Sequence, residues 1–151
     1  MKVPKNIEQL RSLLTISDDK TETIYGVMER MQTLLTLFEK EPKYRGLVPF
    51  LQTYYFVTST AAKRYEKKEN TFSHRRDHEL LDVYFAGLYF KPLLAFVEKG
   101  ECLIPWKSYY AYCQNPRGIP FLQVLLGINA HINTDLYSAL VACEYKHKKD
   151  Y

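Results

Sequence analysis

The sequence predicts an all-α fold, a single bundle of about five or six helices with a long central helix at its C-terminal end. Three observations support this prediction. Apolar residues recur at three- and four-residue spacing along several segments, which is the period of a helix packed on one face. No segment shows the strict alternation of a half-buried strand. The 151 residues, 46% of them hydrophobic, suffice for one domain, which we place at 1–151.

Three helices are expected in the first half of the chain. Asn6 is a suitable cap for a short first helix. The strongest amphipathic segment runs from about Thr21 to Glu41 and stops at the following proline. A third helix is expected from about Pro49, because proline is tolerated in a first turn. The residues predicted to line its buried side are Phe50, Leu51, Tyr54, Tyr55, Thr58 and Ala62.

The middle of the chain predicts a loop followed by a fourth helix. Segment 63–76 is polar and basic, and its second half is predicted to be a loop. Asp77 is a suitable cap for the fourth helix. Pro92 is expected to kink or end this helix, because it lacks a backbone N–H, and Gly100 is expected to stop it.

The last third predicts a short helix, a turn and a long helix. The short helix opens at Pro105 and runs to about Cys113. Segment 115–120 is dense in Asn, Pro and Gly and predicts a turn. The long helix is expected to start at Pro120 and to reach about Tyr145.

Composition narrows the classes of partner and location. The net charge of +4 is lower than nucleic-acid binders usually show, so a nucleic-acid partner is not expected. No secretory signal and no run of about 18 apolar residues is found, which predicts a cytoplasmic protein without a membrane partner. Homo-oligomerisation is left open. The alternative basic surface for nucleic acid comprises Lys63, Arg64, Lys67, Lys68, Arg75 and Arg76.

The long helix carries four polar residues inside an otherwise apolar segment: Asn129, His131, Asn133 and Asp135. An unpaired buried polar group costs about 1–3 kcal/mol, so a hydrogen-bond network or a ligand must receive them. At 100° per residue, His131 and Asp135 share one face, while Asn129 and Asn133 lie on nearly the opposite face. Both sides of the helix are apolar around these pairs, which predicts that it runs through the middle of the fold.

The His131–Asp135 pair leaves three interpretations open. The two side chains form a hydrogen-bonded pair in the core, or both ligate a divalent metal, or the carboxylate orients the imidazole as a general base. Asp82 has apolar neighbours on the fourth helix and is the predicted second carboxylate of this centre. Tyr89, on the face of Asp82, and Trp106 are the predicted ligand contacts.

Several stretches resemble one protein family. Segment 126–136, LGINAHINTDL, resembles the hallmark of the bacterial domain-of-unknown-function family 5995. Segments 27–31, 54–58 and 81–89 resemble its other helices in the same order, and Trp106 matches a tryptophan that follows them. The resemblance implies a helical unit and a site, but no known activity. The site residues it implies are Asp82, Asn129, His131, Asn133 and Asp135.

The resemblance spans roughly 23–142, and it implies that related chains often extend past the position of Ala142. Two functional hypotheses follow. In the first, Asp82, His131 and Asp135 form a buried polar centre that binds a metal or a small ligand and supports hydrolase-like chemistry, with Asn129 and Asn133 in support. In the alternative, the chain is a non-enzymatic structural or protein-interaction domain whose polar residues only lock the core. No cofactor follows beyond the candidate divalent metal.

Overall fold

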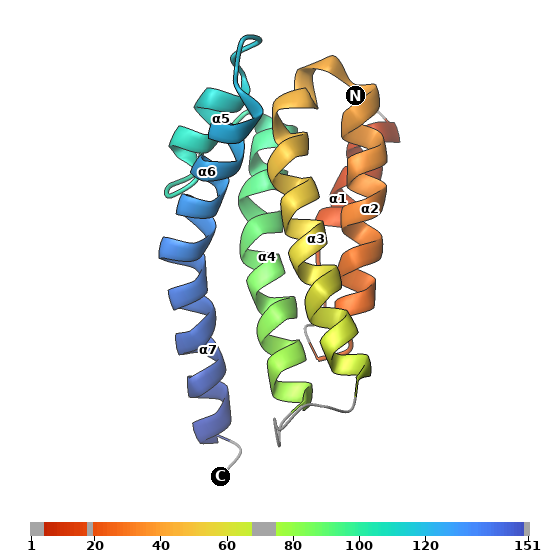
Figure 1. Ribbon diagram of the computed structural model, residues 1–151, viewed down its shortest axis with the longest axis vertical. Helices are drawn as coiled ribbons and strands as arrows, with labels where there is room; N and C mark the ends of the chain where they lie inside the picture. Colours follow the sequence, from red (N-terminus) through yellow and green to blue (C-terminus); the bar gives the residue numbers. More distant parts are fainter. Residues whose placement is uncertain (1–4, 18–19, 68–74, 150–151) are drawn as a thin grey trace.

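A computed structural model describes residues 5–17, 20–67 and 75–149, and these residues form helices and turns with no strand, which confirms the all-α class. The elements are α1 (Lys5–Leu14), α2 (Ile24–Lys40), η1 (Pro42–Leu47), α3 (Val48–Glu66), α4 (Arg75–Lys99), α5 (Lys107–Cys113), α6 (Pro120–Ala130), η2 (His131–Asp135) and α7 (Leu136–Lys149). Figure 1 shows α7 beside α4 on one side of the bundle and α2 beside α3 on the other, and α4 also packs on α1. The predicted loop of 63–76 falls mostly on 68–74, outside the described residues.

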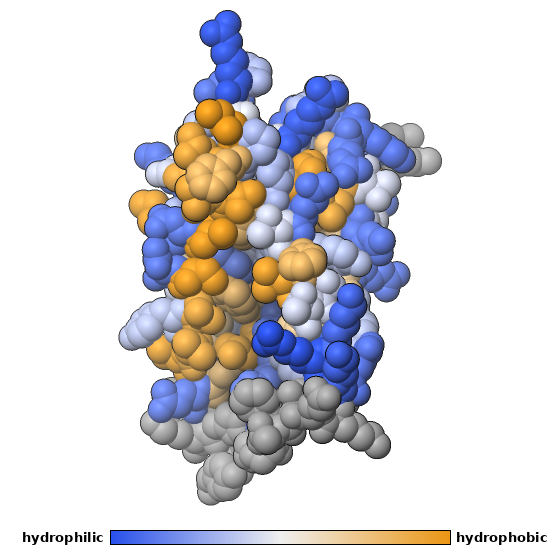
Figure 2. Space-filling view, in the orientation of Figure 1, coloured by the Kyte–Doolittle hydropathy of each residue, from blue (hydrophilic) through white to orange (hydrophobic). Residues whose placement is uncertain are grey.

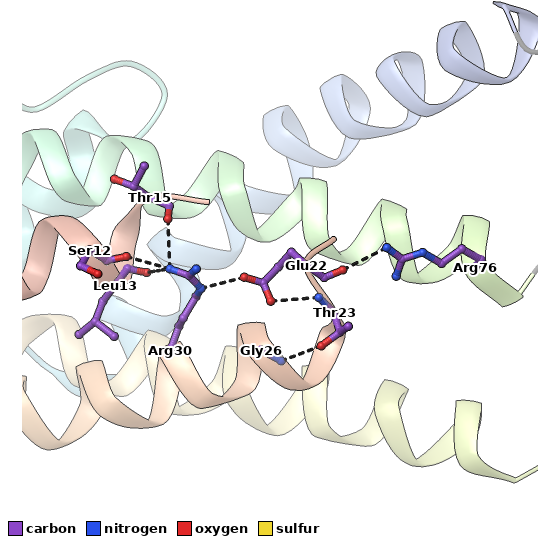
Figure 3. Close-up of polar contacts among 8 residues, drawn as sticks. All are labelled: Ser12, Leu13, Thr15, Glu22, Thr23, Gly26, Arg30 and Arg76. Atoms are coloured by element: carbon purple, nitrogen blue, oxygen red, sulfur yellow. Dashed lines mark hydrogen bonds and ion pairs between the residues drawn. The ribbon is translucent and has the colours of Figure 1, made fainter. Parts of the chain in front are cut away.

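Arg30 of α2 ties the end of α1 to the start of α2 (Figure 3). Its guanidinium donates to three backbone carbonyls at 2.8–3.2 Å and pairs with the Glu22 carboxylate at 3.0 Å. The last carbonyls of a helix lack partners within it, so this contact satisfies groups that would otherwise face only water. Thr23 caps α2, because its hydroxyl accepts the N–H of Gly26. The three carbonyls are those of Ser12, Leu13 and Thr15.

The fourth helix differs from its prediction at Pro92 and agrees with it at Gly100. Of the two outcomes expected at Pro92, a kink or the end of the helix, the end is wrong, because α4 continues to Lys99 with Pro92 inside it. Pro92 has no N–H, so α4 lacks one backbone hydrogen bond at this position. The ring of Pro92 is buried in the core. Gly100 has a φ of +70°, and its N–H and that of Glu101 reach back to carbonyls of Phe96 and Ala95. The bond from the Gly100 N–H to the Phe96 carbonyl is that of the αL ending of a helix, which explains why glycine stops α4 here.

The core is built around aromatic rings. Phe50 of α3 lies at its centre, with the rings of Tyr89, Trp106 and Tyr109 at centroid distances of 5.4–5.7 Å. Edge-to-face arrangements of this kind stabilise beyond the buried area alone. Most of the buried aromatic residues therefore lie in α3, α4 and α5 or directly before α5.

The prediction that the last long helix runs through the middle of the fold is wrong. The helices α6, η2 and α7 follow one another without a break along one side of the bundle (Figure 1). Their inner face packs on α3 and α4, and their outer face is exposed. The inner face carries small or polar residues, namely Gln123, Gly127, Ala130, His131, Asp135 and Ala139.

Large apolar side chains occupy the outer face of this helix, which we call the apolar stripe. Figure 2 shows it as a continuous hydrophobic band over α6 and α7. Hydrophobic periodicity locates two apolar sides of a helix but cannot tell which side is covered, so the sequence alone did not reveal this exposure. The stripe consists of Ile119, Phe121, Leu122, Leu125, Ile128, Ile132, Tyr137, Leu140 and Val141.

Among the described residues, one helix is long and apolar enough to cross a membrane by length and composition, the part of α4 from Arg76 to Lys99. The core helix of a soluble protein passes the same test. Here Val83, Phe90 and Leu93 of this helix are fully buried in the protein core. The cytoplasmic location stays a prediction.

Candidate functional site

Three side chains form a buried polar network where η2 meets α5. His131 Nδ1 lies 2.9 Å from Asp135 Oδ2, and the indole N–H of Trp106 donates to the same oxygen at 3.0 Å. His131 and Asp135 are only 3% and 6% exposed, and Trp106 is buried as well. The predicted i,i+4 pair is therefore formed, and Trp106 is joined to it by a hydrogen bond.

Aromatic rings enclose the imidazole of His131. Phe85 of α4 is stacked on it, with a centroid distance of 3.6 Å and an interplanar angle of 6°. Tyr54 of α3 approaches it edge-on at 4.6 Å. The rings of Trp106, Tyr89 and Phe50 follow at 5.7, 5.9 and 6.1 Å. The predicted ligand contacts Tyr89 and Trp106 thus both lie against His131, and both are buried.

The enclosure sets the protonation of the imidazole. Burial lowers the pKa of His131, and the hydrogen bond and charge of Asp135 oppose that effect. A neutral imidazole that donates from Nδ1 to the carboxylate keeps its lone pair on Nε2. Nε2 is buried and has no hydrogen-bond partner among the described residues, and the same holds for the hydroxyls of Tyr89 and Tyr110. A base oriented in this way could accept a proton at Nε2.

A π turn places the two polar side chains. The five residues of η2 are wound more widely than an α-helix, and the N–H of Leu136 reaches the carbonyl of His131 five residues earlier. Turns of this kind are rare and recur at functional sites. One turn before η2, Gly127 faces the core, where an added Cβ would lie 2.4 Å from the ring of Phe50. Helix packing therefore accounts for this glycine.

Asp82 lies apart from the His131 network. The Tyr65 hydroxyl donates to its Oδ2 at 2.5 Å, and the two residues line a cleft of about 350 Å³ between α3 and α4. Burial raises the pKa of Asp82, and the hydrogen bond from Tyr65 opposes this. Among the described residues, no hydrogen bond or ion pair joins Asp82 to His131 or Asp135. The carboxylates of Asp82 and Asp135 both raise the pKa of Tyr54, after the larger effect of its burial.

Asn129 and Asn133 lie on the opposite side of the helix from His131, as their spacing predicted. Both are exposed, and the side-chain amide of Asn133 donates to the side-chain oxygen Oδ1 of Asn129 at 2.7 Å. This one hydrogen bond joins them within the apolar stripe, and among the described residues no hydrogen bond links them to the buried network. Their role as ligand contacts stays a prediction.

A family comparison bears on the whole chain. The model of a family of unknown function, DUF5995, matches residues 24–151. The chain belongs to this family. The match confirms the family expected from segment 126–136 and its companion segments. Neither a curated protein nor a solved structure matches the chain. Because the family description states no activity, the function of this DUF5995 chain is argued from its own geometry.

The candidate metal ligands of this DUF5995 chain are two side chains, those of His131 and Asp135. Within the described ranges, no group of three or more His, Cys, Asp or Glu residues lies together so that it could hold a metal. His131 and Asp135 would supply two ligands, whereas a structural zinc site usually has four from the protein. The metal role of this pair stays a prediction.

Sequence reasoning missed the two rings closest to His131, those of Phe85 and Tyr54. A signal existed for Phe85, because it precedes Tyr89 by four residues and so shares its face of α4. No comparable signal existed for Tyr54, since its contact with His131 depends on how α3 packs against η2. Contacts between helices far apart in sequence do not follow from the period of either one.

Proposed function

We propose that this DUF5995 chain is a non-enzymatic protein-interaction domain that docks a partner on its apolar stripe. The observation that carries the proposal is the exposure of nine large apolar side chains, each 37–71% exposed, along one helix. Between positions 118 and 143 the only His, Lys, Arg, Asp or Glu residues are His131 and Asp135, and both are buried. An exposed apolar patch of this length is typical of an interaction surface.

The buried network supports this function by holding the π turn that aligns the stripe. One extra residue in a helix rotates all later side chains by about 100°. With the π turn in place, Tyr137 and Leu140 of α7 continue the line of Phe121 and Leu125 on α6, and Ala139 faces the core. The hydrogen bonds of Asp135 to His131 and Trp106 span this turn and anchor it to α5.

The polar residues within the stripe favour a protein partner over a lipid surface. Helices that lie on membranes usually flank their apolar face with Lys and Arg. The stripe instead contains the Asn129–Asn133 pair, and Ser138 is also exposed beside it. Amide groups that become buried need hydrogen-bond partners, and a protein surface supplies them whereas hydrocarbon does not.

Photo-cross-linking in the source cells tests the proposal. A photoreactive residue at Phe121 or Ile132 is expected to give one discrete protein adduct, and the adduct should disappear when Leu125→Lys adds a charge to the stripe. Phe56 is the matched control, because its exposure of 69% is close to the 67% of Phe121 but it lies on α3. The absence of a protein adduct at both stripe positions, or equal adducts at Phe56, would contradict the proposal.

A second candidate function rests on the unpartnered Nε2 of His131. In this candidate, the oriented imidazole binds a metal or a small ligand, or acts as a base in hydrolase-like chemistry, with Asp135 as co-ligand or orienter. Elemental analysis of protein purified without an affinity tag or chelator tests it. The candidate expects near-stoichiometric metal in the wild type that is lost in His131→Ala. If both proteins lack metal and a thermal-shift screen finds no ligand that distinguishes them, this candidate fails.

A further inference from the structure

We infer that the partner docked on the apolar stripe is a second copy of this chain, packed antiparallel about a two-fold axis near position 131. This inference rests on the proposed interaction function and names its partner. Most soluble oligomers are symmetric, and a two-fold interface requires a surface that complements itself. The stripe meets this requirement in its area, its polar residues and its charges.

The area of the stripe is sufficient for a stable dimer. A large side chain has on the order of 200 Å² of surface. Nine such side chains that are on average about half exposed offer on the order of 900 Å² per chain. A stable interface buries about 800 Å² on each partner, and burial of the whole stripe would reach this size.

The order of residues along the stripe is self-complementary. In an antiparallel pair centred near position 131, Phe121 of one copy lies level with Val141 of the other, and Leu125 lies level with Tyr137. Asn129 then lies level with Asn133 of the second copy. The two amides already pair within one chain at 2.7 Å, and they have further donors and acceptors for an exchange between copies. A single polar pair in an apolar seam fixes its register.

One pair of opposite charges, at the two ends of the stripe, agrees with the same arrangement. Arg117 is exposed just before α6, and Glu144 is exposed on α7 beyond Val141. An antiparallel dimer brings Arg117 of one copy level with Glu144 of the other at both ends. A parallel dimer would instead place Arg117 beside Arg117 and Glu144 beside Glu144. The stripe between them carries no charge, so the net charge of +4 per chain does not oppose contact there.

Sedimentation velocity of the purified chain tests the inference, with Phe121→Lys and Phe56→Lys as a matched pair. The wild type and Phe56→Lys are expected to form dimers whose fraction rises with concentration. Phe121→Lys is expected to raise the dissociation constant at least about tenfold, which corresponds to about 1.4 kcal/mol. Leu125→Lys is a second variant for the case that Phe121→Lys fails to fold, as judged from Trp106 fluorescence.

Cross-linking between isotope-labelled and unlabelled copies tests the orientation. A photoreactive residue at Leu125 is expected to attach near Tyr137 of the other copy. A wild type that stays monomeric at all concentrations, or attachment near Leu125 itself, would overturn the inference. These failures are distinguishable from failure of the proposed function: adducts in cells to a different protein keep the interaction function and remove the second copy, whereas no adducts in cells remove both.

Discussion

At the scale of single residues, His131 shows how the surroundings of a side chain decide its chemistry. Its ring is stacked on Phe85 and held by Asp135 from one nitrogen, while the other nitrogen is buried. Burial disfavours the imidazolium and lowers the pKa, and the nearby carboxylate recovers only part of that cost. The neutral ring suits a packed core, and the same neutral ring would suit a base or a metal ligand.

A pH dependence of stability follows from the lowered pKa of His131. In the unfolded chain the group titrates near its ordinary value of 6.5, so below that pH the unfolded state binds a proton that the folded state does not. The free energy of unfolding is therefore expected to fall as the pH drops from above 6.5 toward the lowered pKa. Urea unfolding of the wild type and His131→Gln, at about pH 7.5 and 5.5, measures this.

His131→Gln is the comparison because it removes the titration of this group while it keeps a polar side chain that can hydrogen-bond. The pH-dependent loss of stability is expected to be smaller in the variant. All other titratable groups are the same in the two proteins, so their contributions are common to both curves. Equal pH dependence in the two proteins would show that His131 is not held neutral by its surroundings.

At the scale of helices, the sequence predicted most elements and missed the one irregularity that matters for the site. Thr23, Pro120 and Gly100 sit where capping chemistry expects them, and α2, α5 and α6 begin close to their predicted starts. The π turn at 131–135 was not predicted, because periodicity assumes a uniform helix. Local spacing still paired His131 with Asp135, since residues four apart share a face with or without the extra width.

The partners of these residues on other helices were beyond sequence reasoning. Asp82 was expected beside His131, yet its carboxylate accepts from Tyr65 on α3 in a separate cleft. The helical period gives the face on which Asp82 lies, but the rotation of α4 against α3 and η2 decides which neighbour that face meets. Trp106 was predicted as a ligand contact; it is buried, and its indole N–H donates to Asp135. Its role as a ligand contact stays a prediction.

At the scale of the whole molecule, one core and one exposed stripe share the same long helix. The inner face of α6 and α7 is small and polar, so it contributes close packing and hydrogen bonds more than apolar area. The aromatic cluster around Phe50 therefore carries much of the hydrophobic stabilisation, while the large apolar residues of the stripe remain available for docking. The buried core thus stabilises the fold, and the outer face of α6 and α7 is available for interaction.

This division predicts very different costs for two phenylalanines of the same helix. Phe50 is 3% exposed and contacts rings of α4 and α5, whereas Phe56 is 69% exposed. Phe50→Ala removes a buried ring and leaves a cavity, so it is expected to cost about 3–5 kcal/mol of the free energy of unfolding. Phe56→Ala is expected to change it by less than about 0.5 kcal/mol. Urea unfolding at a fixed protein concentration, followed by the fluorescence of the single tryptophan, Trp106, measures both. Similar costs for the two variants would mean that the core does not lie where the packing of Phe50 puts it.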